Sequence, residues 1–372
     1  MKYIDEFRNG EIAQRLAQTI TQVAHSDRIY RLMEFCGGHT HAIFRYGIQD
    51  ILPDSIRMIH GPGCPVCVLP VGCIDNAIEL AKTKNIMLCS YGDMMRVPGS
   101  SKESLISVKA SGSDVHMVYS CLDALKMARE NPEKEIVFFA IGFETTTPPT
   151  ALAIQTAIRE NLTNFSVFCN HVLTPPAISA ILGTPGGHNQ DKIPLDGFIG
   201  PAHVSTVIGS KPYGHFAQEY KRPVVIAGFE PLDILQAILM LVRQINSGRH
   251  EVETEYIRAV TEDGNQKAQL LMGEYLELRE TFEWRGLGRI PHSALQIKEK
   301  YAKYDAAKRF GITYQSKPDP AGCDCAAIIR GIKKPPECAL FGKSCTPESP
   351  IGSCMVSAEG ACAAYYQYRS HT

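Results

Sequence analysis

The last fifty residues of the chain contain six cysteines among many glycines and prolines. Four of them follow the spacing C-x12-C-x6-C-x16-C: Cys325, Cys338, Cys345 and Cys362. Iron–sulfur clusters are bound by cysteine thiolates, and irregular loops let distant cysteines converge. A zinc site is the alternative, but structural zinc sites usually contain close C-x2–4-C pairs, which these four lack. Unliganded thiols are disfavoured because little apolar core is available here to bury them. We therefore expect a metal centre, and an iron–sulfur cluster in preference to zinc.

A second cysteine pair, Cys64 and Cys67, forms a C-x-x-C motif between an apolar run and a helix predicted over residues 72–82. A helix N-terminus stabilises a nearby thiolate, and two sulfurs at this spacing can form a reversible disulfide. The motif therefore favours dithiol redox chemistry. Metal ligation together with nearby Cys73, and a purely structural role, stay open as alternatives.

The third candidate site is the segment CGGHTH at residues 36–41, which carries Cys36, His39 and His41. Its two glycines permit unusual backbone angles and the close approach of a ligand. A thiol beside an imidazole can be kept as a thiolate, which is both a nucleophile and a soft ligand for iron. In the alternative, structural interpretation the histidines cap a helix over residues 40–48 and Cys36 ends a buried strand. The nearby C-x-x-C motif favours the functional interpretation.

Other polar residues also follow apolar runs. The segment GFETTTP at residues 142–148 is typical of a loop that can hold an anion, although a threonine cap before a helix explains it almost as well. Glu144 and Glu230 would flank a shared cleft if two halves of the chain face each other. His203 is either a cleft residue or a buried core histidine. Three cysteines at the ends of apolar runs are expected to be buried strand residues: Cys89, Cys121 and Cys169.

These motifs lie at the ends of a repeated pattern of short apolar runs and helical segments. The runs cover residues 29–35, 55–60, 86–91, 115–119, 136–141, 165–169, 195–200 and 224–227. Short strands that alternate with helices predict parallel sheets, whose functional sites form at the carboxyl ends of the strands. We therefore predict the α/β class, with two similar Rossmann-like domains whose parallel sheets face a cleft. A helical and loop-rich C-terminal iron–sulfur domain would follow them.

A faint internal repeat sets the predicted domain boundaries. GFE occurs at residues 142–144 and again at 228–230, and GPGC at 61–64 resembles GPAH at 200–203. We predict an N-terminal helical segment over residues 1–27, one α/β domain over 28–131 and a second over 132–235. The third domain would cover residues 236–372, with long helical stretches over 238–245 and 253–282 before an irregular tail.

Composition narrows the class of protein. The chain has 372 residues, a net charge of −1 and 13 cysteines. Its balanced charge argues against nucleic-acid binding, which needs a basic surface. No apolar run is long enough to span a bilayer, and the first residues lack the pattern of a secretory signal, so we expect a cytoplasmic protein. In a reducing cytosol, many cysteines indicate metal binding or thiol chemistry before structural disulfides.

Six motifs, in the same order along the chain, resemble those of the HypD family of hydrogenase maturation factors. They are CGGHTHAIF at residues 36–44, GPGCPVCVLP at 61–70, GFETTTPPTA at 142–151, GFEPLD at 228–233, EWRGLG at 283–288 and a cysteine tail that closes with EGACAAYYQYR. The resemblance covers nearly the whole chain. It implies a scaffold on which the Fe(CN)₂CO group of NiFe hydrogenases is assembled, in complex with a HypC-type small chaperone. A HypE-type carrier would supply cyanide, and contact with the hydrogenase large subunit would be indirect.

The resemblance also implies roles for individual cysteines. Cys36 would hold the iron together with a cysteine of the chaperone, while His39 and His41 line the same cleft. Cys64 and Cys67 would be the redox pair. The ligands of a 4Fe–4S cluster would be Cys325, Cys338, Cys345 and Cys362, and electrons would pass from this cluster through the dithiol to the iron. The chain also carries Cys323 and Cys354 beside these ligands, and each is a candidate to replace one of them.

Three functional hypotheses follow. The first is a metal-cofactor assembly scaffold with redox activity, for which the question of true enzymatic turnover stays open. The second is a stand-alone iron–sulfur thiol oxidoreductase that acts on a small substrate. The third is a zinc-stabilised interaction module without chemistry of its own. The family resemblance favours the first.

Overall fold

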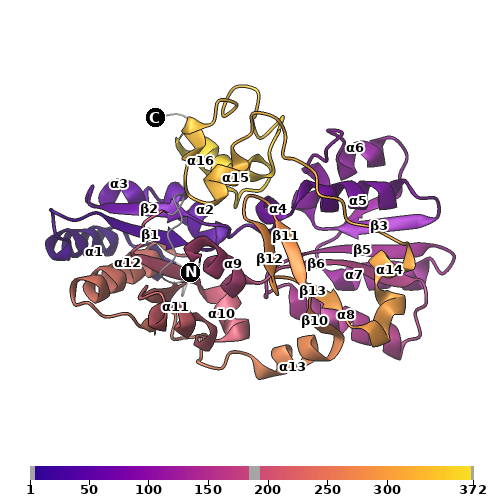
Figure 1. The fold of residues 1–372 in the computed structure, drawn as a ribbon, viewed down its shortest axis with the longest axis horizontal. Helices are drawn as coiled ribbons and strands as arrows, with labels where there is room; N and C mark the ends of the chain where they lie inside the picture. The colour runs from indigo at the N-terminus through magenta and orange to yellow at the C-terminus, as the bar shows by residue number, and fades with distance from the viewer. Residues whose placement is uncertain (1–4, 184–192, 370–372) are drawn as a thin grey trace.

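Two parallel sheets form the framework of the protein in the computed structural model, which describes residues 5–183 and 193–369. A five-stranded sheet has the order β2-β1-β7-β8-β9, and a four-stranded sheet has the order β4-β3-β5-β6. The two sheets lie toward opposite ends of an elongated molecule (Figure 1). The first contains β1 (Tyr30–Glu34), β2 (Ile56–His60), β7 (Gly197–Pro201), β8 (Val224–Ala227) and β9 (Val252–Thr254). The second contains β3 (Ile86–Ser90), β4 (Val115–Met117), β5 (Glu135–Gly142) and β6 (Phe165–His171).

The eight predicted apolar runs correspond to β1 through β8, and the predicted α/β class with parallel sheets is confirmed. Strand β5 shows why these runs lack polar residues. Its alternate side chains Ile136 and Phe138 pack with α7 and α8 on one face, while Val137 and Phe139 join the central core on the other. A parallel strand covered on both faces must be apolar throughout, because successive side chains point to opposite faces.

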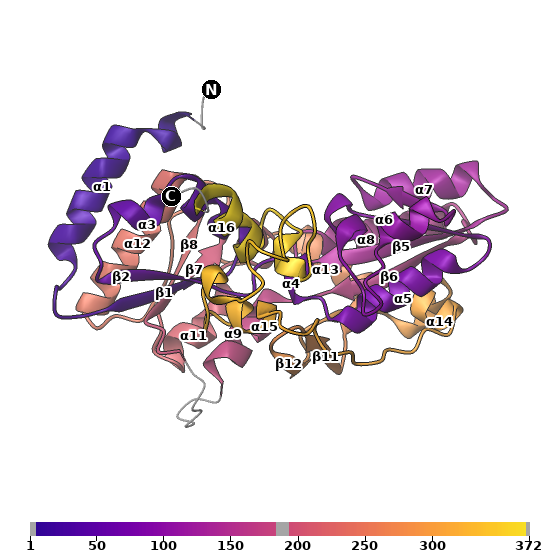
Figure 2. The same ribbon diagram turned by 90° about the horizontal axis from the view of Figure 1, so that it is seen from above.

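Helices cover the faces of both sheets (Figure 2). Over the first half of the chain they are η1 (Asp5–Arg8), α1 (Gly10–Val23), α2 (Gly37–Arg45), α3 (Ile48–Ile51), α4 (Pro65–Val68), α5 (Val71–Lys82), η2 (Gly92–Arg96), α6 (Leu105–Ala110), α7 (Cys121–Glu130) and α8 (Thr147–Arg159). Before β9 follow α9 (Thr174–Leu182), α10 (Ala202–Ile208), η3 (Lys211–Tyr213), α11 (Gly214–Gln218) and α12 (Pro231–Asn246). No helix within the described ranges is long and apolar enough to cross a lipid bilayer.

The chain crosses between the two sheets, and this differs from the predicted domain order. After β1 and β2 it leaves for the four-stranded sheet, and after β6 it returns to add β7 beside β1. The predicted boundary at residues 131–132 is therefore wrong for the sheets, since it lies between β4 and β5 of a single sheet. The internal repeat used for that prediction marks similar turns at the carboxyl ends of strands. Such turns recur in any parallel sheet and do not locate a domain boundary.

The stretch from residue 253 to 282 was predicted as long and helical, and this is wrong. It contains the end of β9, the helix α13 (Gln266–Tyr275) and the short strands β10 (Leu276–Leu278) and β11 (Thr281–Trp284). Strand β9 extends the five-stranded sheet beside β8, so pairing with a neighbouring strand overrides the local helical pattern. The hairpin of β11 and β12 (Gly288–Pro291) and the pair of β10 with β13 (Leu295–Ile297) follow. The predicted helix over residues 238–245 lies within α12.

The cysteine-rich tail lies over the junction of the two sheets. Its elements are η4 (Glu299–Tyr304), α14 (Ala306–Arg309), α15 (Cys325–Ile329), η5 (Pro335–Glu337), η6 (Ser353–Met355) and α16 (Ala361–Arg369). Helix α14 still packs on β6, whereas α15 contacts α4 and α16 packs along α2 (Figures 1 and 2). The predicted third domain is therefore too long, because α12 packs on the five-stranded sheet and β9 extends that sheet. The tail returns to α2 and α4, which carry the cysteine motifs of the first seventy residues.

Candidate functional site

Cys36 lies at the carboxyl end of β1, the strand between β2 and β7. It is the N-cap of α2, and its Sγ accepts a hydrogen bond from the backbone N–H of Gly38 at 3.4 Å. Its own backbone N–H donates to the carboxyl of Glu34 at 2.9 Å. The thiol is only 4% exposed. The end of a central parallel strand, followed directly by a helix, is where open α/β sheets place their ligands.

His203 is the imidazole that lies beside this thiol. Its Nδ1 is 3.8 Å and its Nε2 3.9 Å from Cys36 Sγ. Burial lowers the pKa of His203 to about 4, so the ring is neutral at pH 7. Burial raises the pKa of Cys36 well above its usual value, and the carboxylates of Glu359 and Glu34 add to this effect. Without a bound cation, Cys36 therefore stays a neutral thiol that packs beside a neutral imidazole.

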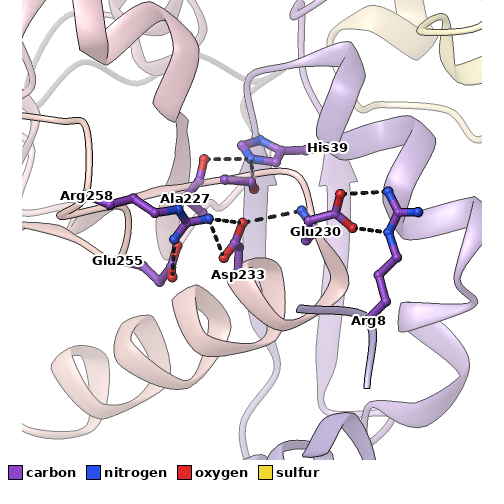
Figure 3. A network of polar contacts seen from close by, with 8 residues as sticks. Arg8, His39, Ala227, Glu230, Asp233, Glu255 and Arg258 are labelled. Carbon is purple, nitrogen blue, oxygen red and sulfur yellow. Dashed lines mark hydrogen bonds and ion pairs between the residues drawn. The ribbon is translucent and has the colours of Figure 1, made fainter. Parts of the chain in front are cut away.

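His39 and His41 form their contacts with groups other than the Cys36 thiol, and their placement in the same cleft as Cys36 stays a prediction. His39 points its Nε2 at the carbonyl oxygens of Ala227 (3.1 Å) and Gly228 (2.9 Å) (Figure 3). His41 contacts the C-terminal tail instead, with Nδ1 3.3 Å from the Ala358 carbonyl oxygen. The spacing C-x-x-H-x-H cannot show these directions, because residues 37 to 45 form a helix whose side chains point different ways. Both histidines link α2 to other elements.

Glu34 was missed by the sequence analysis. Its fully buried carboxyl contacts the Thr40 hydroxyl, lies 2.8 Å from His60 Nδ1 and accepts the Cys36 N–H. A buried carboxyl is stable only when such partners satisfy it. The available signal was a glutamate at the end of a strand whose other residues, apart from Arg31, are apolar or aromatic. Such a residue is either at the surface or part of a site.

The C-x-x-C motif lies directly against the Cys36 loop. A Cβ atom added to Gly63 would be 2.3 Å from the Cys36 Cα, so only glycine fits where the two loops touch. Cys64 caps α4, and its Sγ accepts the Cys67 N–H at 3.3 Å. The predicted helix over residues 72–82 is α5, but the motif begins the separate short helix α4. Cys73 is buried inside α5, where burial raises its pKa to about 12.

Cys354 connects the C-x-x-C motif with the tail. Its thiol interacts electrostatically with the Cys67 thiol and with the thiols of Cys325 and Cys362. The Ser353 hydroxyl donates to the Cys67 carbonyl oxygen at 3.3 Å, which holds η6 against α4. Burial raises the pKa of Cys67 well above its usual value. The sequence analysis named Cys354 only as an alternative cluster ligand. Its position between Cys67 and the tail cysteines depends on contact between segments almost three hundred residues apart, which no local pattern shows.

The four predicted cluster ligands surround one small cavity in the tail, and Cys323 lines it as well. The lining cysteines are Cys323, Cys325, Cys338, Cys345 and Cys362. The other walls are mostly apolar, with Ile328, Leu340, Phe341 and Met355. Backbone N–H groups already point at two of the sulfurs: Ile351 N–H at Cys345 and Cys354 N–H at Cys325, both at 3.4 Å. Soft donors, apolar walls and N–H···S contacts fit the chemistry of an iron–sulfur cluster.

The sulfurs are not yet in a coordinating arrangement. Across residues 5–183 and 193–369, no group of three or more His, Cys, Asp or Glu side chains is already placed to hold a metal ion. Cluster binding would therefore require small movements of these loops. Proline and glycine residues without regular pairing make such movements possible here more easily than in a sheet.

The GFETT loop ends in the predicted threonine cap, because Thr146 is the N-cap residue of α8, and anion binding by the loop stays a prediction. Glu144 is buried and accepts hydrogen bonds from the Thr174 N–H (2.8 Å) and hydroxyl (2.9 Å). The Thr146 hydroxyl donates to the Phe143 carbonyl oxygen at 3.1 Å and makes no capping hydrogen bond to the helix backbone. Glu230, for its part, is paired with Arg8 (Figure 3). The two glutamates therefore have separate partners, and the proposed shared carboxylate cleft is not formed by them.

The other cysteines match the prediction of burial. Cys89 and Cys169 lie in β3 and β6, as predicted. Cys121 is buried as predicted but is not a strand residue: β4 ends at Met117, and Cys121 is the first residue of α7, which Ser120 caps. All 13 cysteines are free thiols. The reactive candidates are thus separated from structural cysteines by their contacts with other thiols or with an imidazole.

Comparison with known proteins agrees with the motifs. The family model HypD, described as the hydrogenase formation hypA family, matches residues 11–369. The hydrogenase maturation factor HypD of Rhizobium leguminosarum bv. viciae is 61% identical over 368 residues, covering 99% of this chain and 96% of the relative. That of Cupriavidus necator is 60% identical, with 99% and 97% covered. The HypD of Escherichia coli K12 is 43% identical over 374 residues, with 99% and 98% covered. With this identity over its whole length, the chain belongs to the HypD family of hydrogenase maturation factors.

Proposed function

We propose that the chain is the scaffold on which the Fe(CN)₂CO group of NiFe hydrogenases is assembled, with redox support from its own thiols and a 4Fe–4S cluster. The observation that carries the proposal is the continuity of three cysteine sites. The Cys36 loop touches the C-x-x-C loop at Gly63, and Cys67 contacts Cys354, which contacts the cysteine cavity. These contacts connect Cys36, the proposed iron ligand, with the C-x-x-C dithiol and the proposed cluster, which would supply electrons.

Cys36 is proposed to hold the iron, which is the cargo of the scaffold. A thiolate is a soft, anionic ligand that suits low-spin iron with cyanide and carbonyl ligands. The buried Cys36 thiol keeps its proton until a cation arrives, and the S–Fe bond forms as that proton leaves for the solvent. His203, 3.8 Å from the thiol, is the imidazole that packs against this position. A HypC-type chaperone is proposed to contribute a second cysteine, and a HypE-type carrier to supply cyanide. Contact with the hydrogenase large subunit would be through the chaperone.

The cluster would be held by Cys338, Cys345, Cys362 and one member of the pair Cys323 and Cys325. Five cysteines line the cavity, whereas a 4Fe–4S cluster takes four. Cys323 and Cys325 both line the cavity, and the Cys325 thiol also interacts with the Cys354 thiol, so Cys325 links the cavity to Cys354 whichever member of the pair is the ligand. When bound, such a cluster supplies single electrons. The ligand set first assigned, with Cys325, stays a prediction.

Cys64 and Cys67 are proposed to be the dithiol that exchanges these electrons. Forming a disulfide between them releases two protons and two electrons, and reducing it takes the same number back. Cys354 is the thiol in contact with Cys67 from the cavity side, which makes it the contact through which the two sites communicate. All these thiols are free, which suits a reducing compartment, and we place the chemistry in the cytoplasm for that reason.

Infrared spectroscopy on the complex tests the iron assignment. The chain would be produced anaerobically with its maturation partners, and the bands of iron-bound cyanide and carbonyl recorded. We expect Cys36→Ala to abolish these bands while the broad visible absorption of the cluster persists. Cys121→Ala, at a buried cysteine in the four-stranded sheet, is the matched control and should retain both signals. Iron-bound cyanide and carbonyl bands at full strength in Cys36→Ala would contradict the proposal.

The alternative of a stand-alone thiol oxidoreductase has less support from the geometry. Cys64 and Cys67 are 4% and 3% exposed, so a protein substrate cannot reach them without movement of the surrounding loops. A zinc-stabilised interaction module would leave Cys36 and His203 unexplained. Metal analysis of the anaerobic protein separates the cases, because zinc without iron would favour the module.

A further inference from the structure

The N-terminal helix η1 lies against the turn that follows β8, far away in sequence. Arg8 of η1 forms a two-pronged ion pair with Glu230, with Nε–Oε2 at 2.5 Å and Nη2–Oε1 at 2.7 Å (Figure 3). Its neighbour Phe7 stacks under the guanidinium of Arg258, 4.4 Å from the ring centre. Paired N–H···O contacts between a guanidinium and a carboxylate fix orientation as well as distance. Residues 7 and 8 therefore brace the turn of residues 228–230, which we call the Phe229 turn.

The Phe229 turn is also held from its own side of the fold. Asp233 accepts the Glu230 backbone N–H at 3.4 Å and pairs with Arg258 at 3.0 Å (Figure 3). Arg258 lies 3.6 Å from the ring centre of Tyr256. A Cβ atom at Gly228 would be 2.1 Å from Asp233 Oδ2, so the backbone is packed closely against these groups. Arg8 is the member of this network that comes from a separate, N-terminal element.

The opposite face of the Phe229 turn contacts the Cys36 loop. The Phe229 ring lies between two imidazoles, with its centre 4.9 Å from that of His39 and 5.0 Å from that of His203. A Cβ atom at Gly38 would be 3.0 Å from this ring. His39 also binds the carbonyl oxygens of residues 227 and 228. A shift of the turn must therefore move His203 or open the packing over Cys36.

We propose that Arg8 is a positioning residue for the Cys36 site, acting through Glu230 and the ring of Phe229. Its ion pair keeps the Phe229 turn pressed against Gly38 and His203, which keeps the thiol covered and beside His203. Arg8 itself touches neither Cys36 nor anything bound there. The inference rests on the reactive role of Cys36 in the proposed function, but access to the thiol can be measured whether or not iron binds there.

Alkylation of the purified, full-length chain by iodoacetamide measures this access, with the modified peptides followed by mass spectrometry. Because Cys36 is buried, its alkylation rate reports local opening of the loops that cover it. We expect Arg8→Ala to raise the Cys36 rate about two- to five-fold, the range that corresponds to loss of a solvent-accessible ion pair. Cys89, fully buried in the other sheet, serves as internal reference and should keep its rate.

Two further variants make the test specific. Arg15→Ala removes an exposed arginine of α1 that pairs only loosely with Glu11 at 3.8 Å, and it should leave the Cys36 rate unchanged. The charge swap Arg8→Glu with Glu230→Arg should restore the slow rate. An unchanged Cys36 rate in Arg8→Ala overturns the proposal, as does an equal rise at Cys89, which would indicate general destabilisation. A swap variant as fast as Arg8→Ala would overturn the route through Glu230.

Discussion

Similar glycine-containing turns follow the strands at the carboxyl ends of the two sheets. The two sheets differ in whether the polar side chains on these turns have hydrogen-bond partners. In the five-stranded sheet, Cys36 after β1 faces His203 after β7, and the nearest polar contact of the thiol is a single backbone N–H. In the four-stranded sheet, the polar groups at the corresponding ends have side-chain partners. Glu144 after β5 accepts two hydrogen bonds from Thr174, and the Nε2 of His171 at the end of β6 lies 2.9 Å from the Thr150 hydroxyl, while the buried Nδ1 of His171 has no partner within the described residues.

This difference shows that topology alone does not make a site. Both sheets place polar residues where open α/β sheets bind ligands. In the GFETT loop, threonine side chains fill the space and satisfy their neighbours, as Thr146 does with the Phe143 carbonyl oxygen. In the CGGHTH and GPGC loops, glycines let two backbones touch and leave a thiol without a strong partner. The glycines of the CGGHTH and GPGC loops therefore leave the Cys36 thiol available as a ligand. The threonines of the GFETT loop fill the corresponding space at the end of β5.

The largest effect is expected from a substitution of Gly63, which lies where the C-x-x-C loop touches the Cys36 loop. Gly63→Ala places a Cβ atom 2.3 Å from both the Cα and the N of Cys36, and backbone atoms cannot move aside as a side chain can. We expect the free energy of unfolding to fall by about 4 kcal/mol, with loss of hydrogenase maturation. Urea unfolding measures the first effect, and a maturation assay the second.

The matched control is Gly273→Ala in α13. Nothing lies within 4 Å of a Cβ atom there, and alanine favours helix more than glycine does, so stability should rise by about 1 kcal/mol. If Gly63→Ala were as stable and as active as the natural protein, the close contact of the two loops would not be part of the site.

A pH-dependent effect is expected from the closed loop of the four-stranded sheet. Burial raises the pKa of Glu144 to about 7 from a usual value of 4.5, so the folded protein holds this proton more tightly than the unfolded chain. The contribution of Glu144 to stability is therefore full below pH 4.5, decreases as the pH rises to about 7 and is constant above that. The total change corresponds to about 3 kcal/mol.

Glu144→Gln removes this titration, so the difference in unfolding free energy between the natural protein and the variant should change across that pH window. Denaturant unfolding at several pH values measures it. Glu277→Gln, at an exposed glutamate, is the control and should follow the natural protein at every pH. A constant difference between Glu144→Gln and the natural protein from pH 4 to 8 would show that Glu144 is less enclosed than the structure indicates.

A smaller pair of effects compares the two sheets directly. Thr40→Val removes the hydroxyl that contacts the buried Glu34 carboxyl, and Thr150→Val removes the one beside His171. Each variant leaves a buried polar group with one partner fewer, at a cost of about 2 kcal/mol in stability. Only Thr40→Val should also change the alkylation rate of Cys36, since Glu34 binds the Cys36 backbone N–H. If Cys36 were alkylated at the same rate in Thr40→Val and in Thr150→Val, Glu34 would have no part in holding the Cys36 loop.

The motifs revealed the chemistry because cysteine, glycine and histidine in these patterns have few other uses. The eight strands and the burial of Cys89, Cys121 and Cys169 were also predictable, since they depend on local runs of apolar residues. The directions in which the His39 and His41 side chains point could not be predicted from the sequence. A side chain on a helix can reach several neighbours, and which one it meets depends on the position of β8 and α16.

The sequence by itself determined the class of fold and the family, and it marked the candidate thiols, because these depend on local periodicity and on residue types with specialised chemistry. Only the tertiary structure decided the crossing of the chain between the sheets, the pairing of β1 with β7 that brings His203 to Cys36, and the place of Cys354 between Cys67 and the cysteine cavity. These features arise from contacts between segments far apart along the chain. Such contacts are selected by packing of the whole molecule, and no local pattern encodes them.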